Sequence, residues 1–133
     1  MKTVNENGPK STTADQGQAI VSLRQTSLGN ILVDAAGRTL YLFTSDRDAS
    51  STCYEGCDEY WPPLNTSGKP LGADGIEATK LGVSARTDGT TMVTFNGHPL
   101  YYFIKDSNAG DVAGQGYNNV WFVLDANGNA ITS

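Results

Sequence analysis

The chain has 133 residues, a formal net charge of −5 and a sequence pI near 4.6. Its length suits one domain with its own core, and its negative charge argues against nucleic acid or an anionic membrane surface as a partner. No stretch approaches the roughly 20 apolar residues of a membrane-spanning helix, so no transmembrane span is expected. The 15 glycines, with many Asn, Ser, Thr and Asp residues, indicate frequent tight turns and therefore an all-β protein.

Residues 1–19 are polar and contain no apolar run before Ala19-Ile20-Val21. No hydrophobic region of a signal peptide is present, so the protein is either cytosolic or exported with its signal removed and a start Met supplied. Two interpretations of the segment stay open. It is a flexible tether of the kind that separates a lipid anchor from its domain, or it is an ordinary disordered terminus.

The sequence is duplicated. Residues 21–71 align with residues 81–131 at an offset of 60 without a gap, and twelve of the 51 aligned positions are identical. The densest match is G-x-x-L-Y-x-F-x-x-D, from Gly37 to Asp46 and again from Gly97 to Asp106. A repeat of this kind predicts two similar halves related by an approximate two-fold axis. Residues that occur in only one half are then the first candidates for a specific function.

The strand pattern follows the repeat along the chain. Residues 19–25 alternate between apolar and polar side chains, and residues 80–85 repeat them. Residues 30–34 and 39–43 predict a hairpin, and its copy is stronger because Asn96-Gly97 separates the two runs.

An irregular segment follows each hairpin and ends at a repeated tryptophan. The final strand starts at Val120-Trp121, whereas its counterpart Trp61-Pro62-Pro63-Leu64 carries two prolines and predicts an edge or extended segment. We therefore expect one duplicated domain at residues 20–133, with about eight antiparallel strands. They would form a sandwich or a partly closed barrel of two pseudo-symmetric halves, with helix confined to a turn or two near Cys53.

The two cysteines, Cys53 and Cys57, occur in the first half only. If the residues between them form one helical turn, their Cα atoms lie roughly 6 Å apart, within disulfide range. A structural disulfide would stabilise the fold by about 2 kcal/mol and would indicate an oxidising compartment. A redox-active pair and metal ligation are the alternatives.

Six aromatic residues are paired by the repeat, and tyrosine and phenylalanine two positions apart share one face of a strand. We interpret this face as the core, with an exposed platform for sugars as the alternative. The opposite face carries Leu40, Leu42 and Leu100 and is also apolar, so both faces are expected to be buried. The aromatic residues of the motif are Tyr41, Phe43, Trp61, Tyr101, Phe103 and Trp121.

Asp46 and Asp106 end their strands, where a carboxylate commonly caps a turn by accepting backbone N–H groups. The alternative is a calcium site, because Asp106, Asn108 and Asp111 place oxygen ligands at intervals like the start of a calcium loop. An EF-hand is excluded, since Tyr117 stands where it would need glutamate. The lone histidine, His98, is a candidate ligand for haem or a metal, or else a solvated turn residue.

Few residues suggest catalysis. A single histidine gives no Ser-His-Asp or Cys-His arrangement that spacing supports. The two repeated aspartates could form a hydrolase dyad across the pseudo-two-fold. Gly110, Gly114 and Gly116 do not form a phosphate loop, because no Lys-Ser or Lys-Thr follows them.

Three stretches together resemble a bacterial family, the "secreted repeat of unknown function". They are G-R-T-L-Y-L-F-T-S-D, C-Y-E-G-C-D-E-Y-W-P-P-L and N-G-H-P-L-Y-Y-F-I-K-D with the later G-Q-G and V-W-F-V-L. The resemblance covers about residues 28–128, including the spacing of the cysteines, and implies a predicted lipoprotein with a Y-x-[FWY]-x-x-D motif. It implies an extracytoplasmic location in the periplasm, at the cell surface or in the medium, and no catalytic residue.

These observations favour an exported, non-enzymatic binding or surface-structural module of the cell envelope, with a protein or a glycan as its partner. A lipid anchor in the precursor is inferred from the family only. The second hypothesis is a metal- or haem-binding accessory protein for envelope redox chemistry, and the third is an aspartate-dyad hydrolase. No cofactor is expected under the first hypothesis, and calcium or haem under the second.

Overall fold

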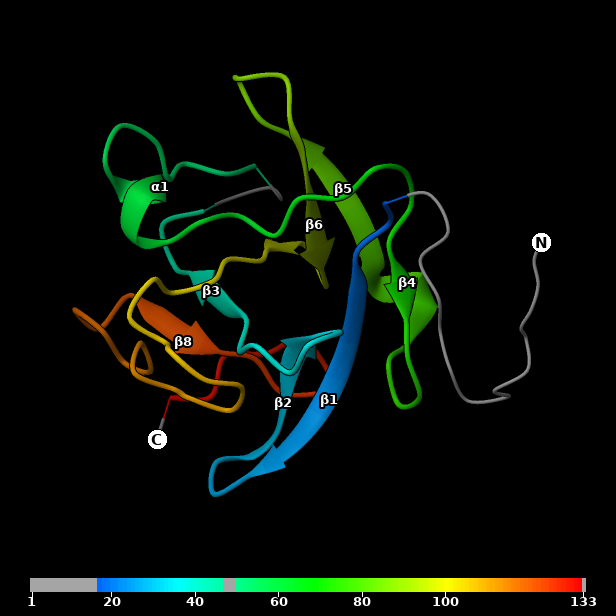
Figure 1. Ribbon diagram of the computed structural model, residues 1–133, viewed down its shortest axis with the longest axis vertical. Helices are drawn as coiled ribbons and strands as arrows, with labels where there is room; N and C mark the ends of the chain where they lie inside the picture. Colours follow the sequence, from blue (N-terminus) through cyan, green and yellow to red (C-terminus); the bar gives the residue numbers. More distant parts are fainter. Residues whose placement is uncertain (1–16, 47–49, 133) are drawn as a thin grey trace.

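The structure is a computed structural model that describes residues 17–46 and 50–132. Within these residues the strands form three small sheets with helix only in short turns, so the predicted all-β class is confirmed (Figure 1). The strands are β1 (Ile20–Thr26), β2 (Gly29–Asp34), β3 (Tyr41–Phe43), β4 (Leu71–Gly72), β5 (Leu81–Ala85), β6 (Thr91–Phe95), β7 (His98–Pro99) and β8 (Trp121–Val123).

The sheets have the orders β2-β1-β4, β3-β8 and β5-β6-β7. They stay separate instead of closing into one continuous sheet, and Figure 1 shows them around a common interior. Most pairs are antiparallel, but β4 runs parallel to β1, with Ile20 opposite Leu71. The expectation of a purely antiparallel protein is therefore wrong at this edge. The segment that links the halves includes β4 and runs beside β1 in the same direction. The β1–β4 pairing is only two residues long.

The two halves are interlocked by their last segments. β8 of the second half pairs with β3 of the first half. In the same way, the first-half segment after Trp61 pairs with the second half, through a bridge from Pro63 to Tyr101 and a hydrogen bond from Tyr102 N to Pro62 O of 2.7 Å. The two prolines limit this copy to isolated bridges, as the sequence predicts.

The pseudo-two-fold axis passes between the two motif tyrosines. Tyr41 N donates to Tyr101 O at 2.8 Å, and Tyr101 N donates to Tyr41 O at 3.0 Å. The predicted hairpin of residues 30–34 and 39–43 is reduced to a turn and a single bridge between Val33 and Thr39, because β3 takes β8 as its partner. In the second half the Asn96-Gly97 turn does join β6 to β7, with φ angles of 53° and 80°.

One part of the gapless alignment of the repeats does not hold in the structure. Val21 pairs with Asp34, whereas its counterpart Leu81 pairs with Phe95, so β2 and β6 correspond at an offset of 61. The turn between β5 and β6 is one residue longer than the turn between β1 and β2. The next turn, between β6 and β7, is one residue shorter than its counterpart after β2. A one-residue slip turns each side chain to the opposite face of a strand. Val33 accordingly joins one core cluster and Val93 the other.

Two apolar clusters fill the interior on opposite faces of the central strands. Along β3 and its flanks, Leu40 and Leu42 enter one cluster and Tyr41 enters the other. The same alternation holds at β8, where Trp121 and Phe122 face opposite clusters. Both faces of these strands are therefore buried, as the apolar runs predict. The cluster around Leu40 is mainly aliphatic but includes Phe122, and the cluster around Tyr41, which we call the aromatic cluster, holds both tryptophans.

A disulfide joins Cys53 to Cys57, with their Cα atoms 5.2 Å apart, and confirms the predicted pairing. The residues between the cysteines do not form the expected helical turn, since Glu55 and Gly56 have φ angles of 55° and 99°. The helix α1 (Cys57–Tyr60) starts at the second cysteine instead. A 3₁₀ turn, η2 (Ala78–Lys80), lies in the linker, where no helix was expected.

The predicted tether lies outside the described residues as far as residue 16. Its last residues contact the end of the first repeat: Ser67 N donates to Gly17 O, and Ala19 N donates to Thr66 Oγ1 at 2.9 Å. Gly17 and Ala19, which belong to the predicted tether, therefore take part in contacts with the folded domain.

Candidate functional site

The repeated tyrosines and aspartates bond between the halves. Tyr41 Oη donates to Asp106 Oδ2 at 2.7 Å, and Tyr101 Oη donates to Asp46 Oδ2, also at 2.7 Å. We call these two contacts the reciprocal pairs. Tyr41 and Tyr101 are fully buried and Asp106 is nearly so, because each side chain crosses the aromatic cluster to reach the strand end of the opposite half.

Each aspartate also accepts from the loop that follows it. Asp46 Oδ1 accepts from Thr52 N and Thr52 Oγ1, both at 2.7 Å, and Asp106 Oδ1 accepts from Ala113 N at 2.8 Å. The prediction that these carboxylates cap turns therefore agrees with their contacts. The sequence did not indicate their second role, in which the same carboxylate binds a tyrosine of the other half.

The two pairs differ in what faces the phenol oxygen. Tyr41 Oη accepts from the backbone N–H of Gly114 at 3.1 Å, where a Cβ on Gly114 would lie 2.7 Å from Trp61. At the other pair, Ser51 Oγ lies 2.6 Å from Tyr101 Oη and accepts from Arg86 Nη1. A backbone donor in one half is thus replaced by a serine and an arginine in the other.

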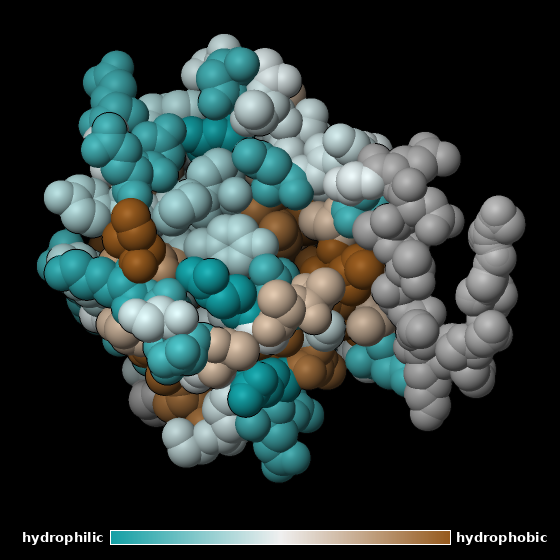
Figure 2. Space-filling view, viewed as in Figure 1, coloured by the Kyte–Doolittle hydropathy of each residue, from teal (hydrophilic) through white to brown (hydrophobic). Residues whose placement is uncertain are grey.

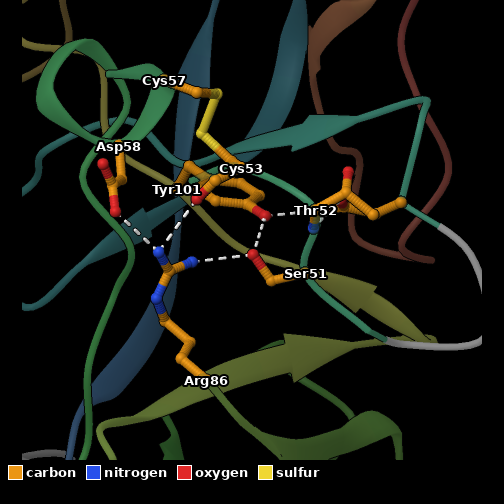
Figure 3. Close-up of a disulfide and its surroundings, with 8 residues drawn as sticks. Ser51, Thr52, Cys53, Cys57, Asp58, Arg86 and Tyr101 are labelled. Atoms are coloured by element: carbon orange, nitrogen blue, oxygen red, sulfur yellow. Dashed lines mark hydrogen bonds and ion pairs between the residues drawn. A yellow bond between two sulfur atoms is a disulfide. The ribbon is translucent and has the colours of Figure 1, made fainter. Parts of the chain in front are cut away.

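Arg86 connects the Tyr101 pair to the disulfide loop (Figure 3). Its Nη2 donates to Cys53 O and to Asp58 Oδ2, both at 2.9 Å, and its guanidinium lies 4.2 Å from the ring centroid of Tyr54. The side chain is almost fully buried. Arg86 is not among the residues that the sequence patterns single out. The signal available was that Arg86, a charged residue, stands opposite Thr26 of the first half.

Burial dominates the electrostatics of the reciprocal pairs. It raises the pKa of Tyr41 and of Tyr101, and the neighbouring carboxylates Asp106 and Asp46 act in the same direction. Tyr102, which donates to Asp34 Oδ2 at 2.7 Å, has its pKa raised by the same two causes. Burial also raises the pKa of Asp106, although the hydrogen bonds from Tyr41 and Ala113 oppose it.

These raised pKa values predict that the protein loses stability in alkali. Above the ordinary tyrosine pKa of 10.0, the unfolded chain releases three phenolic protons that the native state keeps. The free energy of unfolding should then fall by about 1.4 kcal/mol per pH unit for each phenol. Urea unfolding from neutral pH to about pH 11 measures the slope. Tyr102→Phe should make the slope less steep by the contribution of one phenol. An unchanged slope in this variant would contradict the raised pKa of Tyr102.

The aromatic cluster contains a continuous stack of four rings in the order Phe43, Trp121, Trp61, Phe103. The two indoles lie 3.9 Å apart with an interplanar angle of 1°, and each indole stacks on one phenylalanine at 4.2 and 4.0 Å. We call this set the aromatic stack. Each tryptophan also meets a motif tyrosine edge-on, so the stack and the reciprocal pairs form one unit.

A hollow of about 410 Å³ opens beside Trp61 and Phe103, at the Phe103 end of the aromatic stack, within the size range of ligand sites. We call it the Trp61 hollow. Tyr60 and Tyr117 are 57% and 41% exposed there, although Trp61 is buried. The hollow is lined by Cys57, Tyr60, Trp61, Phe103, Lys105, Tyr117 and Asn118.

The calcium candidates lie on one loop but have other partners. Asp106 Oδ1 and Oδ2 accept the hydrogen bonds described above, and Asp111 Oδ2 accepts from the backbone N–H groups of Ser107 and Asn108 at 3.0 and 2.9 Å. Within residues 17–46 and 50–132, no three His, Cys, Asp or Glu side chains form a group that could hold a metal ion.

His98 lies apart from the calcium candidates, at the start of β7 and on the Asp46 side. It is half-buried, and burial lowers its pKa while the nearby Asp46 carboxylate opposes the shift. Its counterpart Arg38 donates from Nη2 to Asp106 O at 3.1 Å. The repeat thus places one basic residue near each motif aspartate.

The fold and the reciprocal pairs define a duplicated all-β protein with interlocked halves. The family profile described as "Secreted repeat of unknown function" matches the chain twice, at residues 22–65 and 82–125. The two matches cover more than half of the chain, which therefore belongs to this family. Membership of a secreted family indicates an extracytoplasmic location. No curated protein and no solved structure shows a significant match to the chain. In the part that the structure describes, no helix is long and apolar enough to cross a membrane.

Proposed function

We propose that the protein is an exported, non-enzymatic binding module of the cell envelope and that the Trp61 hollow is its binding site. The motif residues support a structural role because their polar atoms are turned inward. Both phenols are fully buried, and each donates to a carboxylate of the opposite half. A substrate in solvent has no access to groups held in this way.

The observation that carries the proposal is the distribution of repeated and unrepeated residues. The inner wall of the hollow is repeated, since Trp61 matches Trp121 and Phe103 matches Phe43. The rim is not repeated: Tyr60, Lys105, Tyr117 and Asn118 stand opposite Val120, Ser45, Cys57 and Asp58. A duplicated framework requires its shared residues for the fold, so the residues that break the repeat supply the specific contacts.

Co-sedimentation with envelope fractions tests the proposal. The purified chain is mixed separately with peptidoglycan sacculi, with extracted envelope polysaccharide and with membrane vesicles, and bound protein is measured. We expect retention by one fraction and loss of it in the Tyr60→Ala, Tyr117→Ala double variant. Val83→Ala is the matched control, because Val83 is a 50% exposed apolar residue in β5, away from the hollow. Equal retention of both variants, or no retention by any fraction, would refute the proposal.

A further inference from the structure

We infer that the ligand of the Trp61 hollow is a saccharide that carries a carboxylate, an inference that rests on the proposed function. Three features of the hollow define this class of ligand. They are exposed aromatic rings, one cationic side chain with an amide beside it, and a rim held in position before a ligand arrives.

The aromatic rings suit the apolar face of a sugar. The C–H bonds on one side of a pyranose carry partial positive charge and pack against the negative face of an aromatic ring. Tyr117 packs on the stack at an angle, 72° to Trp61 and 58° to Phe103, with centroids 5.6 and 5.4 Å away. Because it is tilted and 41% exposed, it presents ring surface to solvent.

The polar groups give the hollow a positive charge. Lys105 is the one charged residue in its lining, although the whole chain carries −5. Among residues 17–46 and 50–132, Lys105 has no ion-pair partner, since the salt bridge there joins Arg86 to Asp58. Its ammonium is therefore available to a ligand carboxylate. The amide of Asn118 can donate to a sugar hydroxyl and accept from one.

The rim is fixed on both sides. Asn118 and Asn119 have φ angles of 50° and 59°, a left-handed conformation that asparagine adopts more readily than most residues other than glycine. Turn hydrogen bonds hold it: Val120 N and Trp121 N both donate to Tyr117 O, at 3.1 and 3.2 Å. The backbone at Tyr117 is thus already ordered in the folded protein, so a ligand does not have to order it on binding.

The opposite side of the rim is held by the disulfide. Tyr60 is the last residue of α1, which begins at Cys57, and Tyr60 O accepts from Ile104 N at 2.8 Å. Figure 2 shows hydrophobic atoms breaking the hydrophilic surface beside α1. The disulfide, which has no counterpart in the second half, therefore positions a residue of the hollow as well as the loop that carries Ser51.

Calorimetric titration with defined probes tests the inference. The probes are the disaccharide of galacturonic acid and its neutral galactose analogue, used at low ionic strength. We expect the acidic probe to bind more tightly than the neutral one. Tyr60→Ala should weaken binding of both probes by about tenfold, and Lys105→Gln should weaken the acidic probe alone by about threefold to fivefold. Lys69→Gln, at an exposed lysine away from the hollow, should leave both affinities unchanged.

The outcomes separate this inference from the proposed function. Equal affinity for the two probes, or no effect of Lys105→Gln, would overturn the requirement for a carboxylate. If neither saccharide binds while an envelope fraction still retains the chain through Tyr60 and Tyr117, the ligand is not a saccharide and the binding module stands. If neither experiment gives binding, both proposals fail. Circular dichroism of every variant verifies that the fold is kept.

Discussion

Replacing Trp121 by alanine is expected to lower the free energy of unfolding by about 3–5 kcal/mol. Trp121 is 3% exposed and stands inside the aromatic stack, between Trp61 and Phe43. It also meets Tyr101 edge-on at 5.2 Å, so its removal leaves a cavity beside one of the reciprocal pairs. Urea unfolding followed by far-ultraviolet circular dichroism measures the loss without depending on tryptophan fluorescence.

Two variants serve as comparisons for this result. Trp61→Ala should cost a similar amount, because the pseudo-two-fold gives it equivalent partners in Tyr41 and Phe103. Tyr60→Ala, one position earlier but 57% exposed, should change stability by less than about 0.5 kcal/mol. A loss below about 1 kcal/mol for Trp121→Ala would mean that the stack adapts to the cavity, and the stack would then not be the centre of the core.

Local patterns in the sequence were sufficient to predict the class of fold and the disulfide. The identities between the halves revealed the duplication, and the period of two along Leu40 to Phe43 indicated that both faces of β3 are buried. The spacing of Cys53 and Cys57 predicted their bond. Each of these features depends on residues that are near one another in the chain, or on a direct comparison of two segments.

The pairing between the halves could not be predicted in this way. Asp46 follows Tyr41 by five residues yet accepts from Tyr101, and no local pattern distinguishes a bond within a half from a bond between halves. The slip in β2 and β6 was hidden for a related reason. The turn before β6 is one residue longer than its counterpart and the turn after β6 is one residue shorter. The offset of 60 is therefore restored after β6, and an alignment without gaps still matches the identical residues on both sides.

The candidate site was only partly accessible to sequence reasoning. The repeat pointed to the motif residues, which prove to be internal, and it also marked the residues found in only one half as the first functional candidates, without showing which of them lie together. Arg86 and Tyr117 both break the repeat, opposite Thr26 and Cys57, and the structure gives each of them a specific position. Most aligned positions differ between the halves, so the differences alone could not show which of these residues meet at the Trp61 hollow.

The interlocking has a consequence for stability. β3 has its strand partner in the second half, and the phenol of Tyr41 has its acceptor there as well. A single half would therefore expose unpaired strand edges and bury a phenol without its carboxylate, both of which are unfavourable. We therefore expect a single half not to fold on its own, since the tyrosines and aspartates of the Y-x-[FWY]-x-x-D motif join one copy to the other.

The clearest test of this interlocking is a double-mutant cycle between Tyr41→Phe and Asp106→Asn. Each single change should lower the free energy of unfolding by about 1–3 kcal/mol, because it leaves a buried polar group without its partner. The double variant should lose less than the sum, with a coupling of at least about 1 kcal/mol.

The control cycle combines Tyr41→Phe with Asp46→Asn, the aspartate of the same motif copy. These two residues share no hydrogen bond, since Asp46 accepts from Tyr101 and Thr52, so their effects should be nearly additive. Urea unfolding at neutral pH measures both cycles. A larger coupling of Tyr41 to Asp46 than to Asp106 would show that the motif closes within each half. In that case the halves would merely pack side by side, and a single copy should fold on its own.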